Sequence, residues 1–402
     1  MSHVRSLRTV GMLALLAALG TVSVNAQQVK KVFVIAMENH NWTQPANQFT
    51  GGIQQIFQNP AAPYINSLVD GTSDISKEVA YAANCRSVLA TPGGNNPHIH
   101  PSEPNYIWAE AGTNFGVAND NDPFRVPGGT NQTTSAHLST LLTNAGLTWR
   151  SYQEDVDLTP IAGQGVNSGG QIVNVPVPPN QYTVPITSFS GVFASGSFNQ
   201  FNGASQFNYA AKHNPMVFFT DTNGGNDATP NNPLSSHYAP LQQLFTDLEN
   251  DTVADYNWIT PNQFNDQHTT LSGGYKGLTG DPAKIFQGDD FLRQVIPVIM
   301  ASHAYQDNGL IILWWDESES DGVAGDNPDD FTHTIPEIII SKHAHQNVNG
   351  VPYASPVLFS HSSDLRTMQE IFSVGPFLGD AANANDLSDL FQPGAIPKNN
   401  LQ

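Results

Sequence analysis

The chain has 402 residues, with 15 Lys and Arg against 35 Asp and Glu, which gives a formal net charge of −20. Such a surface repels nucleic-acid backbones and anionic membranes, so we expect no nucleic-acid partner and no stable membrane association. The single cysteine, Cys85, excludes an internal disulfide. The length suits one large α/β domain with insertions, or two ordinary domains.

Residues 1–26 have the pattern of a secretory signal peptide. Arg5 and Arg8 precede an apolar stretch over 10–24, and Val24-Asn25-Ala26 resembles a signal-peptidase site. The apolar core is short for a membrane anchor. We therefore expect a secreted or periplasmic protein that begins near residue 27.

The rest of the chain alternates apolar runs with helical patterns. Five runs predict buried strands, over 31–37, 215–220, 256–260, 309–315 and 335–341. Helices are predicted over 136–145, 241–251, 289–303 and 363–372. This alternation indicates a mostly parallel sheet covered by helices on both faces.

Two loop-rich ranges and the last segment depart from that alternation. Residues 43–135 and 155–210 are rich in Asn, Gly, Pro and Ser, and we interpret them as insertions at the edge of the sheet or over its carboxyl end. We therefore predict a single catalytic domain over 27–402, with a patternless tail from 375 that lies on the surface.

The first predicted strand ends in Glu38 and Asn39. Ligands in open α/β sheets bind beyond the carboxyl ends of the strands, so these side chains stand where a first pair of oxygen ligands is expected. The alternative is that they open a solvated loop in which Asn39 caps a helix.

The run over 309–315 ends in the same way, in Asp316 and Glu317. Buried carboxylates repel one another unless a cation or an arginine neutralises them, and no Lys or Arg lies within twenty positions of Asp316. A divalent metal is the simpler interpretation, although a solvated acidic turn over 316–321 is the alternative.

The histidines are a weaker signal, because a lone histidine is more often packed or exposed than a ligand. Asp266 and His268 form a stronger pair, since alternate residues of an extended segment after a strand face the same way. His100 and His361 also stand beside polar residues in short motifs.

Five segments together resemble one known family. They are Met37-Glu38-Asn39-His40, His100-Pro-Ser102-Glu-Pro-Asn105-Tyr106, Asn265-Asp266-Gln-His268, Trp315-Asp316-Glu317-Ser, and Ser-His361-Ser-Ser-Asp-Leu-Arg-Thr. Their order is similar to that in the phosphoesterase family of acid phosphatases and C-type phospholipases, within the alkaline phosphatase superfamily. The resemblance implies a three-layer α/β/α sandwich and the hydrolysis of small phosphate esters.

The resemblance also implies roles for individual residues. Ser102 would be the nucleophile, and Asn105 would donate to a phosphate oxygen. The metal ligands would be Glu38, Asn39, Ser102, Asp316 and Glu317. The residues that hold phosphate, a second cation or the leaving group would be His100, Asp266, His268 and His361, with His268 and His361 also counted as catalytic.

One difference from the two-zinc members of the superfamily bears on the metal. Asn39 and Glu317 stand where those enzymes carry an aspartate and a histidine, so we expect one divalent cation of unspecified identity. The leading hypothesis is a secreted acid phosphatase that acts through a phosphoserine. The alternatives are a phosphodiesterase of the C-type phospholipase kind and a non-catalytic exported protein that binds metal or phosphate.

Overall fold

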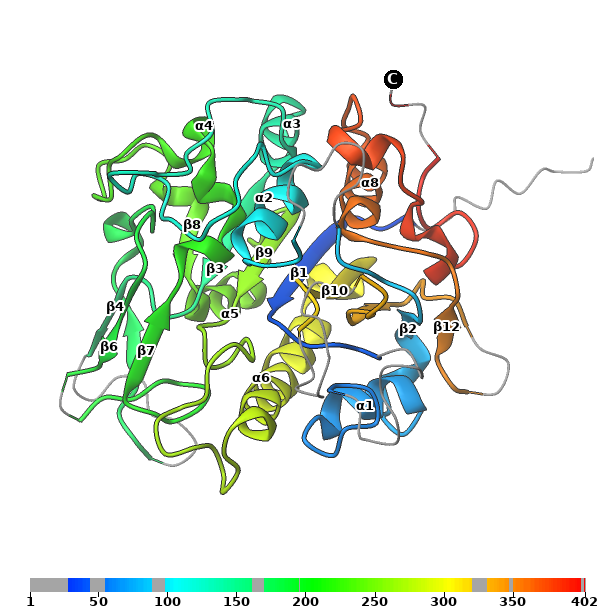
Figure 1. Cartoon of the computed structure of the whole chain (residues 1–402), viewed down its shortest axis with the longest axis horizontal. Helices are drawn as coiled ribbons and strands as arrows, with labels where there is room; N and C mark the ends of the chain where they lie inside the picture. Colours follow the sequence, from blue (N-terminus) through cyan, green and yellow to red (C-terminus); the bar gives the residue numbers. More distant parts are fainter. Residues whose placement is uncertain are drawn as a thin grey trace, which may run out of the picture.

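A computed structural model describes residues 28–43, 55–88, 98–160, 170–194, 196–319, 331–346, 350–398 and 401. The predicted signal peptide lies outside the described residues. Figure 1 shows the central strands with helices packed on both sides, which confirms the three-layer α/β/α sandwich.

Within the described residues the central sheet has eight strands. In spatial order they are β12 (Tyr353–Ser355), β2 (Val79–Ala82), β11 (Glu337–Ser341), β10 (Gly309–Trp315), β1 (Lys31–Met37), β9 (Tyr256–Thr260), β3 (Trp149–Gln153) and β8 (Tyr238–Pro240). Among these, β11 alone runs antiparallel to its neighbours. The side chains of β9, β10 and β11 are buried along their whole length, and those of β1 are buried from Val32 on, because helices cover both faces.

Helices on one face connect parallel strands by crossovers of the same hand. They are α1 (Pro63–Asp70), α5 (Leu241–Glu249), α6 (Asp281–Ala301) and α7 (His303–Gln306). The opposite layer contains α2 (Glu103–Ala111), α3 (Leu138–Asn144), α4 (Thr220–Asn223) and α8 (His361–Phe372). Within each layer the helices pack on one another, α1 on α6 and α2 on α8. Both layers therefore bury their apolar sides against the sheet.

The structure corrects several expected elements. Residues 215–220 are not a strand: Pro215–Phe218 forms the 3₁₀ helix η4, and α4 follows. Helix α6 begins at Asp281, eight residues before the predicted start at 289. The last predicted strand begins at Glu337, and its carboxyl end faces the opposite edge because it is antiparallel to β10.

The loop-rich ranges are more structured than their composition indicates. The first contributes α1, β2 and α2 to the sandwich itself. The second forms two separate hairpins, β4 (Leu158–Pro160) with β5 (Asn174–Pro176) and β6 (Phe189–Val192) with β7 (Gln206–Tyr209). Short 3₁₀ helices complete the chain: η1 (Ser76–Glu78), η2 (Pro179–Gln181), η3 (Ala211–His213), η5 (Ser235–His237), η6 (Gly379–Ala382) and η7 (Leu387–Leu390).

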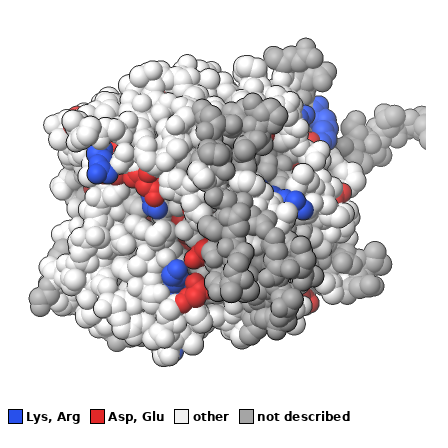
Figure 2. All heavy atoms as spheres, in the orientation of Figure 1, with Lys and Arg blue, Asp and Glu red and all other residues white. Residues whose placement is uncertain are grey.

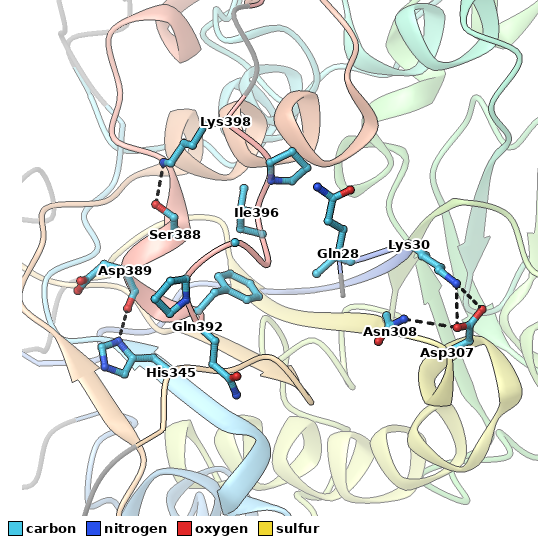
Figure 3. Close-up of a pocket in the computed structure, with 15 residues that line it drawn as sticks. Gln28, Lys30, Asp307, Asn308, His345, Ser388, Asp389, Gln392, Ile396 and Lys398 are labelled. Atoms are coloured by element: carbon cyan, nitrogen blue, oxygen red, sulfur yellow. Dashed lines mark hydrogen bonds and ion pairs between the residues drawn. The ribbon is translucent and has the colours of Figure 1, made fainter. Parts of the chain in front are cut away.

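The segment after 375 is not the surface tail that its composition indicates. Leu387, Leu390 and Phe391 are buried in the main core. Together with residues that precede β1 and β10, this segment lines a cavity of about 1240 Å³ (Figure 3). Gln28, Lys30 and Asn308 lie before the amino ends of those strands, so this cavity is at the opposite edge of the sheet from Glu38 and Asp316.

Candidate active site

Two strand ends bring three carboxylates together at the carboxyl edge of the sheet. β1 and β10 pair in parallel with Met37 opposite Trp315, so the residues that follow them, Glu38 and Asp316, become neighbours. Glu38, Asp316 and Glu317 are completely buried, and each offers one oxygen within 4.8 Å of those of the other two. In Figure 1 the arrowhead of β1 ends near the centre of the molecule, close to α2.

Burial and neighbouring charges shift the pKa values of the three carboxyl groups. Burial, the charge of Glu38 and the charge of Glu317 raise the pKa of Asp316 well above its usual range. Burial also raises the pKa of Glu317 to about 7, although His100 acts in the opposite direction. For Glu38 the burial penalty is outweighed by His213 and Lys212, and its pKa is lowered. Three carboxylates held this closely suit a bound divalent cation.

Asn39 adds a fourth group to the cluster. Its backbone N–H donates to Asp316 Oδ1 at 3.0 Å, and its φ of 42° turns the chain sharply after β1. One terminal atom of its carboxamide lies 2.7 Å from Glu38 Oε2 and 3.2 Å from Glu317 Oε1. As nitrogen this atom donates to both carboxylates, and as oxygen it completes a ring of oxygen donors around one cation. The donor set therefore fits a hard or intermediate cation.

Ser102 lies at the amino terminus of α2 and points into the cluster. Its Oγ is 3.1 Å from Glu317 Oε1 and 3.2 Å from Glu38 Oε2, and the residue is buried. The structure thus brings the predicted nucleophile and the predicted metal ligands together from chain positions more than 200 residues apart. The hydroxyl can pass its proton to Glu317, whose pKa is raised, whereas the lowered pKa of Glu38 makes that carboxylate a poor acceptor.

His100 and Asn105 hold Glu317 from both sides. His100 Nδ1 lies 2.7 Å from Glu317 Oε1, and Asn105 Nδ2 donates to Glu317 Oε2 at 2.7 Å. Asn105 Nδ2 also donates to the Ile99 carbonyl at 3.0 Å. Both amide hydrogens of Asn105 are therefore used within the protein, and its donation to a phosphate oxygen stays a prediction.

Two further residues, to which the sequence analysis assigns no role, contact the cluster. His213, in η3, lies 3.0 Å from Glu38 Oε1 through Nε2 and 3.2 Å from Asp266 Oδ2 through Nδ1. Tyr106 donates to Glu38 Oε1 at 2.7 Å and stacks on His213. Burial would lower the pKa of His213, but Glu38 and Asp266 raise it to about 9.

Lys212 places a second positive charge beside the serine. Its ammonium lies 3.5 Å from Ser102 Oγ and 3.0 Å from Asp120 Oδ2, and its side chain is only 14% exposed. Burial alone would lower its pKa, yet Glu38 and Asp120 raise it above the usual lysine value. The pair Lys212-His213 is conspicuous in a chain with only 15 Lys and Arg, and this scarcity is a signal that could have drawn attention to it.

Asp266 and His268 lie beside the cluster, but in a turn rather than an extended segment. Gln267 between them has a φ of 85°, and Asp266 Oδ1 accepts from the backbone N–H of His268 at 2.8 Å. His268 packs near His213, and burial lowers its pKa to about 4. Asp266 therefore orients His213, and His268 is a neutral ring at neutral pH.

His361 takes a different position from the other predicted residues. It begins α8, and its Nε2 lies 2.9 Å from the carbonyl oxygen of Trp315. Its ring packs against Trp314, and burial lowers its pKa to about 4. A carbonyl oxygen can only accept, so Nε2 donates and His361 supports the end of β10 from behind.

Basic side chains of the described residues do not gather on the face of the molecule in Figure 2. On the face in Figure 2, lysine and arginine side chains are isolated among the described residues instead of gathered into a patch. Within the described ranges, no helix is long and apolar enough to cross a membrane.

The family resemblance is confirmed by comparison with known proteins. The sequence profile of the Phosphoesterase family matches residues 18–375. A phosphatidylinositol-3-phosphatase of Mycobacterium tuberculosis is 25% identical over 336 residues, which is 84% of this chain and 78% of that protein. A probable acid phosphatase of Kluyveromyces lactis is 27% identical over 227 residues, which is 56% of this chain but 39% of that protein.

Solved structures with a related fold are more distant in sequence. A protein in the alkaline phosphatase superfamily from Vibrio parahaemolyticus is 12% identical, with a TM-score of 0.42 over 91% of this chain and 74% of that one. Similarity at this level says nothing about activity.

Proposed function

Because the chain belongs to the phosphoesterase family, we propose that it hydrolyses small phosphate monoesters through a phosphoserine at Ser102. The observation that carries this proposal is the position of Ser102 Oγ, within 3.2 Å of two buried carboxylates and 3.5 Å from a buried ammonium. A binding protein has no need of a hydroxyl in that position.

The metal proposal rests on the donor set. Glu38, Asn39, Asp316, Glu317 and Ser102 would hold one divalent cation, and their oxygen atoms fit such an ion. When bound, this cation supplies positive charge that favours the serine alkoxide and offsets charge on the phosphoryl group. The remaining functions belong to side chains of the protein.

Ser102 attacks phosphorus in line and forms the phosphoserine, while its proton passes to Glu317. Lys212 attracts the anionic group, because its ammonium lies beside the attacking oxygen. His213 and Tyr106 fix Glu38 through Oε1 and leave Oε2 turned to the serine. The second half-reaction is hydrolysis of the phosphoserine by water.

We propose that His100 protonates the leaving alkoxide. Glu317 orients its ring at 2.7 Å, and the side chain is 32% exposed, so it can exchange protons with solvent. His268 is less suited to this role because its lowered pKa leaves it neutral at neutral pH. We propose that His268 and Asp266 lie on the side of the site that holds phosphate, and that His361 supports the end of β10.

The decisive experiment compares the wild-type protein with Ser102→Ala after metal analysis. The variant should keep its fold and most of its metal but lose phosphatase turnover by about three orders of magnitude or more, as nucleophile removal does in other hydrolases. Trapping of radiolabelled phosphate on wild type but not on Ser102→Ala would identify the intermediate. Comparable turnover by both proteins would refute the mechanism.

A substrate panel separates monoesters from the alternatives. It should contain an aryl phosphate, a water-soluble phosphatidylinositol 3-phosphate and phosphatidylcholine. The first two are included because one relative is named a probable acid phosphatase and another a phosphatidylinositol-3-phosphatase. Faster release of choline phosphate than of inorganic phosphate would favour the phospholipase alternative. We also propose that the protein is secreted or periplasmic, on the strength of the signal-peptide pattern over residues 1–26.

A further inference from the structure

We propose that His40, Asp281 and Glu319 form a second cation site, which suits zinc and is separate from the candidate active site. The three residues come from the end of β1, the start of α6 and the segment after β10. Each offers one ligand atom within 4.8 Å of those of the other two. The inference does not depend on the proposed phosphatase activity.

The distance between His40 and Asp281 fits two ligands of one metal ion. His40 Nε2 lies 3.4 Å from Asp281 Oδ1 without a hydrogen bond. Two ligands at about 2.0 to 2.1 Å from a tetrahedral zinc ion are separated by about 3.3 Å along the edge of the tetrahedron. The observed separation is therefore long for a hydrogen bond but close to that of two zinc ligands.

The buried His40 ring is oriented as the ring of a metal-binding histidine is. The ring is completely buried, and its Nδ1 lies 2.9 Å from the carbonyl oxygen of Glu38. Since a carbonyl oxygen only accepts, Nδ1 carries the hydrogen, and in a neutral ring the lone pair of Nε2 points at the two carboxylates. Ligating histidines are oriented in this way in metalloproteins, through the nitrogen that does not bind the metal.

Glu319 is also held in place. Asn41 Nδ2 donates to the Glu319 carbonyl at 2.6 Å, and the Glu319 N–H donates to Asn41 Oδ1 at 3.0 Å. This double contact fixes the backbone on which the carboxylate stands. Glu319 Oε2 is buried, and it has no hydrogen-bond partner among the residues that the structure describes. A histidine and two carboxylates form a zinc ligand set when a water molecule is the fourth ligand, whereas magnesium and calcium prefer oxygen alone.

Lys284 is the competing cation. Its ammonium lies 3.7 Å from Asp281 Oδ1 and 3.8 Å from Glu319 Oε1, beyond hydrogen-bond distance of both. If the cluster were only an ion-pair network, Lys284 would stabilise it. If the cluster binds zinc, Lys284 repels the metal, and its removal strengthens binding. The two interpretations therefore predict opposite effects of one substitution.

The test is zinc titration of the full-length protein after removal of metal by a chelator, with circular dichroism as the check of folding. We expect the wild type to bind one zinc equivalent that Asp281→Asn and Glu319→Gln bind at least about 100-fold more weakly, the upper end of the loss seen when a residue that only orients a ligand is replaced. The side chain of Asp281 is 42% exposed, so its substitution is compatible with folding.

Two controls make the result specific. Asp316→Asn, in the candidate active site, should leave this zinc equivalent in place, so a failure of the phosphatase mechanism does not affect the outcome. Lys284→Met should bind zinc more tightly than wild type. Unchanged zinc binding in both Asp281→Asn and Glu319→Gln, or weaker binding in Lys284→Met, would overturn the proposal in favour of an ion-pair network.

Discussion

Lys212→Met tests whether a positive charge beside the serine drives the reaction. The ammonium lies 3.5 Å from Ser102 Oγ, so a phosphoryl group under attack is within about 4 Å of it. Two unit charges at that distance interact by about 4 kcal/mol at an effective dielectric constant of about 20. Each 1.4 kcal/mol is a factor of about ten in rate, so the upper bound for the loss is about 1000-fold.

We expect kcat/KM for an aryl phosphate to fall by about 100- to 1000-fold in Lys212→Met, with both a higher KM and a lower kcat. The ammonium binds the phosphate of the substrate and also the charge that develops in the transition state, so both constants respond. Steady-state kinetics at fixed metal concentration measure the change. Inorganic phosphate should inhibit the variant more weakly than it inhibits wild type.

Asp120→Asn is the matched control. It removes the anionic partner of Lys212, 3.0 Å away, but keeps the ammonium itself. Since the charge remains beside the serine, we expect kcat/KM to fall by about tenfold or less. A Lys212→Met enzyme within about threefold of wild type, with its fold intact, would show that Lys212 only balances the charge of Glu38 and Asp120.

Other substitutions test the metal, a buried acid and a close packing contact. Glu38→Gln and Asp316→Asn should each lower the bound divalent metal measured by elemental analysis, and unchanged occupancy would remove that residue from the ligand set. Glu103 is buried without hydrogen-bond partners for its carboxyl oxygens, and burial raises its pKa to about 9. Because the folded state holds this proton and the unfolded state releases it, the contribution of Glu103 to stability is greatest below about pH 4.5 and falls as the pH rises to about 9. Glu103→Gln should flatten that fall in thermal melts of the metal-free protein, and an unaltered slope would contradict the assignment. A Cβ at Gly288 of α6 would lie 2.3 Å from Gln267 Cγ, so Gly288→Ala should cost about 1–3 kcal/mol and lower the melting temperature, whereas the exposed Val298→Ala should change little.

The strands that the sequence predicted are those buried on both faces. The apolar runs of β1, β9 and β10 were located with their exact bounds, because continuous burial leaves a continuous apolar run. The run over 215–220 has the same appearance but forms η4 and α4. There Thr222 Oγ1 donates to the Met216 carbonyl and Asn223 Nδ2 to the Val217 carbonyl, so the backbone is satisfied without a sheet. A short apolar run therefore does not distinguish a buried strand from a buried helical turn.

The candidate site also contains residues that the sequence predicts and residues that only the fold brings there. Glu38 and Asp316 could be found because a strand end is visible in the sequence, and the parallel pairing of β1 with β10 joins them. Lys212 and His213 stand in a single 3₁₀ turn, which has no periodic pattern, and only the fold carries them to the strand ends. The motif around His361 predicts a role in catalysis, whereas the contacts of its ring are with the carbonyl oxygen of Trp315 and the side chain of Trp314.

The carboxylates that locate the site also set its dependence on pH. In the metal-free protein the raised pKa values of Asp316 and Glu317 mean that both keep their protons to a higher pH than ordinary carboxyl groups do. A cation must displace those protons, so its apparent affinity falls as the pH falls. Glu38 stays ionised over the same range, because His213 is protonated below its pKa of about 9. The carboxamide oxygen of Asn39 has no proton to lose, so it is a ligand whose affinity does not decline in acid. A neutral amide in that position adds no third proton for a cation to displace, so the proposed site should lose less affinity in acid than a site with an aspartate there.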